Sequence, residues 1–191
     1  MFNKKTSNHH CLVHPCLIDG ENTLIYERGL KQAYRVLFIK YKATGILIDK
    51  QGNDEYQATT AACQGAAWDV ALGLLIDMQG NDQYMGETLC QGTAAMQAQA
   101  WLIDLDGEDN YFATSNSTQG RSGNNTYHFD QSKPVYSWSL LLDAGGQKDN
   151  YSSKQMNDSI NTTADYNYEE PGKTRAHGMF IDTSKILKSL N

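Results

Sequence analysis

The sequence Leu-Leu-Ile-Asp-Met-Gln-Gly-Asn-Asp-Gln-Tyr at residues 74–84 decides the fold, because the chain repeats it. An earlier copy at 46–56 reads Ile-Leu-Ile-Asp-Lys-Gln-Gly-Asn-Asp-Glu-Tyr, and a later copy at 101–111 reads Trp-Leu-Ile-Asp-Leu-Asp-Gly-Glu-Asp-Asn-Tyr. The tripeptide Cys-Gln-Gly falls between the copies, at 63–65 and 90–92. A repeat at a nearly fixed spacing predicts equivalent structural units that pack against one another.

The aspartate that ends each apolar run gives the period of the repeat. The steps between successive aspartates are 28, 27, 39 and 39 residues, at positions Asp49, Asp77, Asp104, Asp143 and Asp182. A period near 27 with two later expansions predicts two insertions, in Ser115–Pro134 and Ser153–His177. Both are rich in Asn, Ser, Thr and Gly, so we expect exposed loops there.

Apolar and small residues alternate with a period of two before each aspartate, which is typical of β-strands. Residues 71, 73 and 75 are Ala, Gly and Leu on one side, whereas residues 72, 74 and 76 are Leu, Leu and Ile on the other. Period and alternation together predict an all-β fold, a parallel β-solenoid (β-helix-like) of about five rungs. The Ala- and Gln-rich segment 93–100 leaves a helical repeat as the alternative.

The segment before the repeat has a different pattern. Residues 24–41 carry apolar side chains at spacings of three and four among several Arg and Lys residues, which indicates a basic amphipathic helix. The run Val36–Ile39 fits a strand equally well. Either element would cap the open end of the repeat. We therefore expect an irregular start and capping segment at 1–44 and a repeat domain at 45–191.

Composition narrows the function classes. The chain has 191 residues, 20% of them charged, and a formal net charge of −6. This diffuse acidic balance disfavours nucleic acid and anionic membranes as partners. No apolar run reaches the 18 residues of a transmembrane helix, residues 1–16 lack the apolar core of a signal peptide, and localisation stays open. No nucleophile is framed by a base and an orienting group, so the sequence favours a non-catalytic protein.

The repeated aspartates are the candidate metal ligands. In stacked parallel strands equivalent residues lie about 4.8 Å apart, so each aspartate position would form a column. Two carboxylates about 5 Å apart repel by about 3 kcal/mol at an effective dielectric constant of 20. Backbone N–H groups, water or cations between the turns can relieve this repulsion, and carboxylate and amide oxygens suit Ca²⁺. The predicted metal-site residues are Asp49, Asn53, Asp54, Asp77, Asn81, Asp82, Asp104 and Asp109.

Two further columns follow from the same register. Gln64, Gln91 and Gln119 would hydrogen-bond to one another along the stack. The Cα atoms of Cys63 and Cys90 would fall within the disulfide range of about 4.4–6.8 Å. Neighbours in register on parallel strands seldom reach the dihedral angle that a disulfide requires, so we expect two buried thiols.

The Gly-Asn-Asp-x-Tyr segments at 52–56 and 80–84 resemble the second half of the nonapeptide of RTX (haemolysin-type) calcium-binding repeats. In that family, Gly-Gly-x-Gly-x-Asp-x-(apolar)-x builds a parallel β-roll with Ca²⁺ between stacked turns. Asp54, Asp82 and Asp109 match the aspartate of the motif, and the resemblance therefore implies calcium at these positions. The unit also looks like the Gly-Asn-Asp-x-Tyr repeats of uncharacterised bacterial proteins, which implies no activity.

Two function classes remain from the sequence. The first is a repeat protein that acts as an interaction or structural surface, with calcium bound between its turns. The second is a carbohydrate-binding or polysaccharide-degrading β-helix protein, because insertion aromatics can stack on sugar rings. Those aromatics are Tyr127, Phe129, Tyr136, Tyr166 and Tyr168, and the acidic pairs for such chemistry are Asp143/Asp149 and Glu169/Glu170.

The partner predicted by the sequence is a protein or a glycan. If the small residues face the interior, the other side of the same strands is an apolar surface too large to remain hydrated. We expect the N-terminal segment, an insertion or a second copy of the chain to cover it. The residues of this side are Leu72, Leu74, Ile76, Trp101, Ile103, Trp138 and Leu140.

Overall fold

The computed structural model describes residues 16–19, 23–28, 37–40, 43–58, 63–122, 136–145, 147–163 and 175–183. These residues form strands and turns, and no helix occurs among them. The strands are β1 (Cys16–Asp19), β2 (Thr23–Arg28), β3 (Leu37–Lys40), β4 (Thr44–Asp49), β5 (Glu55–Gln57), β6 (Ala66–Trp68), β7 (Leu72–Asp77), β8 (Gln83–Gly86), β9 (Gln99–Asp104), β10 (Asn110–Ala113), β11 (Tyr136–Asp143), β12 (Asn150–Tyr151), β13 (Ile160–Thr162) and β14 (Arg175–Asp182).

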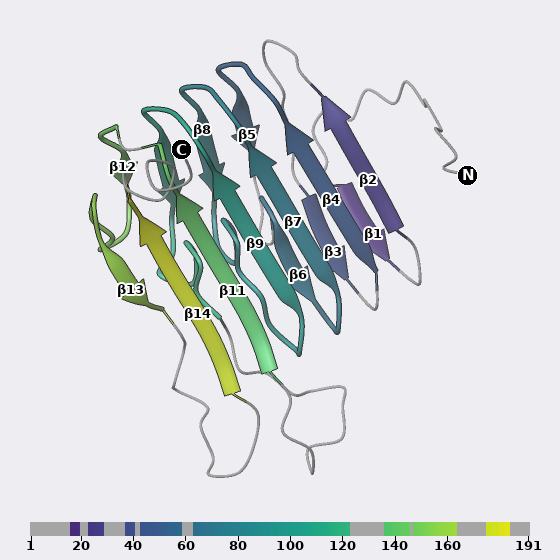
Figure 1. The fold of residues 1–191 in the computed structure, drawn as a ribbon. Helices are drawn as coiled ribbons and strands as arrows, with labels where there is room; N and C mark the ends of the chain where they lie inside the picture. Colours follow the sequence, from purple (N-terminus) through teal and green to yellow (C-terminus); the bar gives the residue numbers. More distant parts are fainter. Residues whose placement is uncertain are drawn as a thin grey trace, which may run out of the picture.

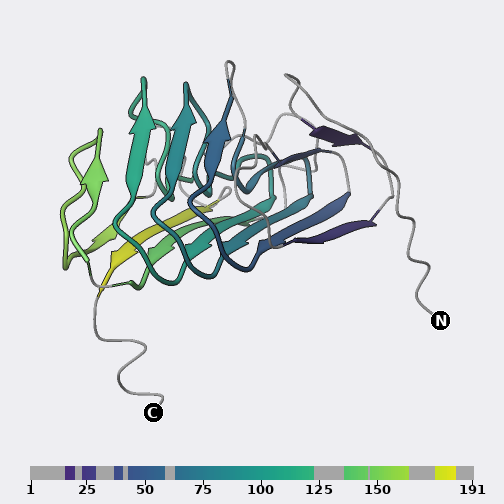
Figure 2. The same cartoon turned by 90° about the horizontal axis from the view of Figure 1, so that it is seen from above.

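The strands belong to three sheets (Figure 1). The largest has the order β13-β14-β11-β9-β7-β4-β2, the second β12-β10-β8-β5 and the third β1-β3-β6. Within each repeat unit the chain leaves the seven-stranded sheet, enters the four-stranded sheet and then returns, as Figure 2 shows from above. Equivalent residues pair in register, for example Asp49 with Asp77 and Asp77 with Asp104. The sequence period thus sets the pairing of the parallel strands.

The predicted fold class, a parallel β-solenoid of about five rungs, is wrong. The described residues form three separate sheets with three, four and seven strands, and the largest sheet mixes parallel and antiparallel pairs. The antiparallel pair joins β13 to β14 between Ile160–Thr162 and Met179–Ile181. Strand β13 comes from the second insertion, whose sequence does not repeat. The repeat pattern therefore could not predict its direction.

Alternation along the strands of the large sheet separates a buried side from a half-buried side. In β7, Gly73, Leu75 and Asp77 are buried, whereas Leu72, Leu74 and Ile76 are half-buried. The predicted period of two and the inward direction of Leu75 and Leu102 are confirmed. Apolar residues that pair in register at the Leu75 position form the centre of the core: Leu47, Leu75, Leu102, Leu141 and Phe180.

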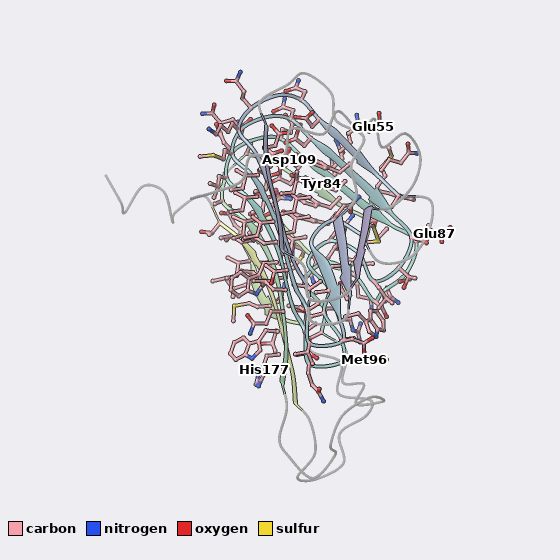
Figure 3. All side chains as sticks on the ribbon, turned by 90° about the vertical axis from the view of Figure 1, so that its right-hand side faces the viewer. Glu55, Tyr84, Glu87, Met96, Asp109 and His177 are labelled. Carbon is pink, nitrogen blue, oxygen red and sulfur yellow. A yellow bond between two sulfur atoms is a disulfide. The ribbon has the colours of Figure 1, made fainter. Side chains whose placement is uncertain are left out.

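A column of tyrosines from the four-stranded sheet packs against these core residues. The rings of Tyr56, Tyr84 and Tyr111 are stacked with centroids 4.8 Å apart, and Tyr151 follows at 5.0 Å. Figure 3 shows Tyr84 and Asp109 in the interior between the layers. The strand spacing of a parallel sheet matches the stacking distance of aromatic rings, so one tyrosine per unit forms a continuous aromatic stack.

The predicted N-terminal segment at 1–44 is different in the structure. Its described parts are the three strands β1, β2 and β3, and β2 pairs with β4 from Thr23↔Thr44 to Arg28↔Asp49. The expected helix over 24–41 is therefore wrong for 24–28, and the strand alternative for Val36–Ile39 agrees with β3 at 37–39. Pairing with an existing sheet edge outweighs the helical spacing of three and four. The irregular start at 1–15 lies outside the described residues.

The Gln-Gly pairs form a left-handed turn in each unit. Gln91 and Gly92 have φ values of 57° and 76°, and the Gln91 side chain donates from Nε2 to the carbonyl oxygens of Tyr84 and Phe112, at 2.9 and 3.1 Å. The predicted glutamine column thus forms, but Gln64, Gln91 and Gln119 donate to backbone carbonyls rather than to one another. These bonds tie the turn to the four-stranded sheet.

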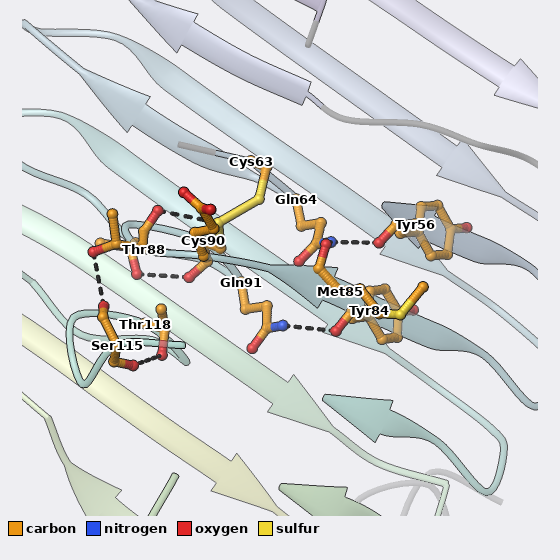
Figure 4. Close-up of a disulfide and its surroundings, with 12 residues drawn as sticks. Tyr56, Cys63, Gln64, Tyr84, Met85, Thr88, Cys90, Gln91, Ser115 and Thr118 are labelled. Atoms are coloured by element: carbon orange, nitrogen blue, oxygen red, sulfur yellow. Dashed lines mark hydrogen bonds between the residues drawn. A yellow bond between two sulfur atoms is a disulfide. The ribbon is translucent and has the colours of Figure 1, made fainter. Parts of the chain in front are cut away.

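Cys63 and Cys90 form a disulfide, and the prediction of two buried thiols is wrong (Figure 4). Their Cα atoms are 4.6 Å apart and they lie at an isolated bridge beside the Gln-Gly turns, outside the named strands. Gly86 packs over the bond, where a Cβ atom would lie 2.6 Å from Sγ of Cys90. The cysteines are thus free of regular strand geometry, and a glycine leaves room for the sulfur atoms.

Candidate metal centre

Each repeat unit places two aspartates at the corner between the seven-stranded and four-stranded sheets. The first aspartate ends a strand of the large sheet, as Asp77 ends β7. The second directly precedes a strand of the four-stranded sheet, as Asp82 precedes β8. Gly80 lies between them, and a Cβ atom there would overlap the carbonyl oxygen of Gly52 in the previous unit. Glycine therefore lets the corners of successive units lie close together, and this brings their aspartates close together as well.

Two of the strand-ending aspartates, Asp77 and Asp104, have donors for both carboxylate oxygens, whereas Oδ1 of Asp143 is buried without a hydrogen-bond partner. Oδ1 of Asp77 accepts a hydrogen bond from the Gln79 backbone N–H at 3.1 Å, and Oδ2 accepts one from the Tyr56 hydroxyl at 2.5 Å. Asp104 repeats this arrangement with the hydroxyl of Tyr84 at 2.6 Å. The tyrosine stack thus presents its hydroxyl groups to the aspartates of the corner.

The second aspartates are only half satisfied. Oδ1 of Asp82 accepts from the Asp54 backbone N–H at 2.5 Å, and Oδ1 of Asp109 accepts from the Asp82 backbone N–H at 2.6 Å. Oδ1 of Asp149 accepts in the same way from Asp109, at 2.7 Å. Oδ2 of Asp82, Asp109 and Asp149 is buried and has no hydrogen-bond partner. A buried carboxylate oxygen without a donor is costly, so each of these atoms calls for a proton or a cation.

The aspartates gather into three groups of three, in which one oxygen of each residue lies within 4.8 Å of the others. The groups are Asp54/Asp77/Asp82, Asp82/Asp104/Asp109 and Asp109/Asp143/Asp149. All seven side chains are buried, with at most 3% of their surface exposed. These buried aspartate clusters could hold metal ions.

Burial and mutual repulsion raise the carboxyl pKa values of several aspartates in the corner. Burial is the largest cause for Asp82, whose pKa rises to about 9, and the charge of Asp77 adds to it. Burial likewise raises the pKa of Asp109 to about 8 and that of Asp149 to about 7. For Asp104, burial and the charge of Asp109 raise the pKa well above its usual value. The charged form of each group therefore requires compensation that the protein alone does not supply.

The structure brings together five of the eight residues predicted from sequence. Asp54, Asp77, Asp82, Asp104 and Asp109 belong to the groups of three. Asp49 is buried at the equivalent position of the preceding unit but lies in none of the groups, and its Oδ1 accepts from the Gln51 backbone N–H. The asparagines are exposed, and Oδ1 of Asn53 and of Asn81 accepts a backbone N–H of the next unit. They stabilise the outer side of the corner instead of facing the aspartates.

Sequence reasoning missed Asp143 and Asp149 as members of the third group. The segment from Asp143 to Tyr151 is one residue longer than its counterparts, which hid the second aspartate from the motif. The tyrosine hydroxyls were also missed as partners of the aspartates. The equal spacing between aspartate and tyrosine in the first three units was the available signal, but it does not show that a tyrosine reaches the aspartate of the next unit.

A polar hollow of about 450 Å³ lies beside the second insertion. Its described lining contains Arg121 and Lys154 and no acidic residue, and the rest is mostly hydroxyl and amide side chains. The aromatic residues expected to stack on sugars are Tyr127, Phe129, Tyr136, Tyr166 and Tyr168, and the side chain of Tyr136 and all of the other four lie outside the described part of the structure. The prediction of a sugar-stacking surface therefore stays a prediction.

Comparison with protein-family models, curated proteins and solved structures found no match to this chain. The resemblance to RTX repeats and to bacterial Gly-Asn-Asp-x-Tyr proteins thus stays a prediction. Within the described residues no helix has the length and apolar character needed to cross a bilayer. The functional argument therefore depends on the aspartate groups and on the surfaces of the sheets.

Proposed function

We propose that this chain is a non-catalytic interaction or structural protein in which calcium ions neutralise the buried aspartates of the sheet corner. The observation that carries this proposal is the unpartnered Oδ2 atom of Asp82, Asp109 and Asp149 inside groups of three carboxylates. A cation between the units would accept these oxygens as ligands and remove the repulsion along both columns.

The chemistry of the ligands favours calcium over magnesium. The oxygens of each group lie within 4.8 Å of one another, and three carboxylates at irregular positions suit Ca²⁺, which accepts variable geometry at about 2.3–2.6 Å. Mg²⁺ requires nearly regular octahedral ligands at about 2.1 Å. Magnesium also keeps its waters more firmly, which suits a buried corner poorly.

The charge balance also supports one calcium ion in each of the three groups. Seven different aspartates make up the three groups, because Asp82 and Asp109 are each shared by two of them. Three divalent ions would bring six positive charges to seven carboxylates. The metal in this proposal is structural, because it fixes the distance between units.

A calcium titration of the metal-free chain tests the proposal. Saturating calcium at about 100 times its dissociation constant should raise the unfolding free energy by about 2.7 kcal/mol per independent site. Isothermal titration calorimetry should give up to three sites, and chelator should reverse the gain in melting temperature. A melting temperature that responds to neither calcium nor chelator would show that protons neutralise the corner.

Asp82→Asn and Asp49→Asn form a matched pair for this experiment. Both residues are buried aspartates, but Asp82 belongs to two groups and Asp49 to none. Asp82→Asn should abolish most of the calcium-dependent stabilisation, while Asp49→Asn should leave the calcium response unchanged. Equal responses in the two variants would contradict the proposed sites.

Glycan binding is the second candidate function, favoured by the hollow beside β13. Arg121 and Lys154 with their hydroxyl and amide neighbours suit an anionic sugar better than a neutral one. A glycan array that contains uronates would test this candidate, with Lys154→Gln as the control variant. Binding to uronates that Lys154→Gln does not weaken would exclude the hollow as the site.

A further inference from the structure

The side of the seven-stranded sheet that faces away from the core, here called the outer face, presents two uncharged apolar rows. The first row is Ile46, Leu74, Trp101, Leu140 and Met179, and the second is Ile48, Ile76, Ile103, Leu142 and Ile181. All ten side chains are half-buried or exposed, and Met179 has 43% of its surface exposed. None of these ten positions carries a charged residue. The outward positions of a sheet face that is exposed to water are normally polar.

A third row extends the apolar character of the outer face. Leu72 and Trp138 lie in this row together with the polar residues Thr44, Gln99 and His177. Trp138 is 51% exposed, and its ring stacks on that of His177 at 4.8 Å. The four- and three-stranded sheets lie on the opposite side of the large sheet, as Figures 1 and 2 show. His177 in Figure 3 marks the outer side. The described residues therefore place no second layer on this face.

The size of the outer face suits a stable protein interface. Five strands at about 4.8 Å and two apolar rows at about 6.8 Å give an apolar patch of about 24 by 14 Å, or about 330 Å² before the third row and the rim are counted. The largest apolar patch on a monomer is about 300–600 Å², and a standard interface buries about 800 Å² on each partner. The outer face with its rim approaches that interface size, and Trp101 and Trp138 supply the side chains that most often anchor interfaces.

We propose that two copies of this chain pack face to face through the outer face. The side chains on the outer face form ridges that recur at the strand spacing, so a second copy of the chain has ridges with the same period. Two such faces can pack together as face-to-face sheets about 10 Å apart. A two-fold axis through the rows would bring each patch onto its equivalent. The face carries no charge in its two central rows, whereas the chain as a whole carries −6, so contact through this face avoids like-charge repulsion.

A membrane is the less favoured occupant. The net charge of −6 repels an anionic leaflet, and no lysine or arginine lies in the three described rows to offset it. This inference deepens the proposed function, because it names the partner of the interaction surface. The dimer does not depend on calcium, so either the dimer proposal or the calcium proposal can be rejected while the other holds.

Sedimentation velocity of the full chain from low to high micromolar concentration tests the proposal. The expected result is a reversible dimer whose tryptophan emission shifts to the blue as concentration rises. Leu74→Lys places a cation at the centre of each face and should weaken the dimer by at least about tenfold. Phe112→Lys is the matched control, because Phe112 is a 54% exposed apolar residue on the four-stranded sheet, and this variant should dimerise normally.

A second variant protects the test against a folding defect. Trp101→Thr keeps strand propensity while it removes an apolar anchor, and it should weaken the dimer without a loss of cooperative unfolding. A chain that stays monomeric at all concentrations would overturn the proposal, as would a dimer that Phe112→Lys disrupts and Leu74→Lys spares. Binding of the monomer to neutral phosphatidylcholine vesicles would also overturn it. A calcium-insensitive chain that still dimerises would reject only the calcium proposal.

Discussion

The hydroxyl group of Tyr84 donates a hydrogen bond to Oδ2 of Asp104 at 2.6 Å. Tyr84 lies in the four-stranded sheet and Asp104 ends a strand of the seven-stranded sheet, so this bond joins two sheets across their corner. Burial raises the pKa of Tyr84 well above its usual value, and the tyrosine is therefore a neutral donor at neutral pH. One tyrosine per unit thus supplies both core packing and a donor to a buried carboxylate.

Tyr84→Phe should lower the free energy of unfolding by about 1–3 kcal/mol, because it leaves Oδ2 of Asp104 buried without its donor. Tyr111→Phe is the matched control. The hydroxyl of Tyr111 makes no hydrogen bond of good geometry, and Asp143 keeps the hydroxyl of Tyr151 at 2.9 Å. Urea denaturation should therefore show a smaller loss for Tyr111→Phe than for Tyr84→Phe. Equal losses would mean that ring packing alone accounts for the recurrence of tyrosine in each unit of this chain.

Without calcium, the protein should become less stable as pH rises from 5 to 8. Burial raises the pKa of Asp77 to about 6, that of Asp109 to about 8 and that of Asp82 to about 9. The unfolded chain releases these protons near pH 4, so the folded state binds more protons across this range. Each such extra proton lowers the unfolding free energy by about 1.4 kcal/mol per pH unit.

Thermal melting in chelator at pH 5 and pH 8 checks this prediction, and the melting temperature should be higher at pH 5. Calcium should shrink the difference or reverse it, because the ion displaces the same protons. Calorimetric titrations in buffers with different ionisation enthalpies should detect protons released on calcium binding. A metal-free melting temperature that rises between pH 5 and pH 8 would contradict the raised pKa values.

The parts of the fold that repeat in sequence were predictable, because repetition and side-chain alternation act together. Leu75 and Leu102 lie in the interior, and Asp77 and Asp104 pair in register as their spacing indicated. Strand β13 was not predictable, since Ile160–Thr162 occurs once and its antiparallel pairing depends on where the insertion meets β14. Likewise, pairing with β4 decides the structure of β2, and local helical spacing does not contain that information.

The candidate site divides in the same way. Asp54, Asp82 and Asp109 stand in a motif and were predictable, whereas Asp149 lies in a unit altered by one residue. The asparagines were assigned to the site because they precede Asp54 and Asp82 in the motif and carry amide oxygens that suit calcium. Their direction follows from the turn, in which Oδ1 of Asn53 accepts a backbone N–H of the next unit on the exposed side. The sequence alone does not show which side of so short a turn each side chain occupies.

Gly73→Ala should cost about 1–3 kcal/mol of unfolding free energy through overpacking, and Gly73→Leu at least as much. A Cβ atom on Gly73 would lie 2.6 Å from the carbonyl oxygen of Ala66, which is backbone and cannot rotate away. Ala100 pairs with Gly73 in register and already carries a Cβ atom, whereas a Cβ atom on Gly178 in the same row would lie 2.7 Å from the carbonyl oxygen of Gly120, so the restriction differs between units. The midpoint of urea denaturation measures the loss. An unchanged midpoint would mean that the backbone at Ala66 can move aside.

The disulfide between Cys63 and Cys90 closes a loop of 27 residues. A loop of that length should stabilise the protein by about 3.5 kcal/mol through the entropy of the unfolded chain. For a chain of this size, its loss should lower the melting temperature by about 10 °C. Mass spectrometry of a non-reduced digest should find the two cysteines in one linked peptide.

A double-mutant cycle distinguishes this bond from two buried thiols. If the disulfide forms, Cys63→Ala, Cys90→Ala and the double variant should lose nearly the same stability, because either substitution opens the loop. If the residues were independent thiols, each substitution would remove only one buried sulfur atom, and the two losses would add. Gly86 lies over both sulfur atoms, where an added Cβ atom would be 2.6 Å from Sγ of Cys90 and 2.9 Å from Sγ of Cys63. Additive losses in unfolding free energy would therefore contradict the disulfide and restore the two thiols expected from parallel strand geometry.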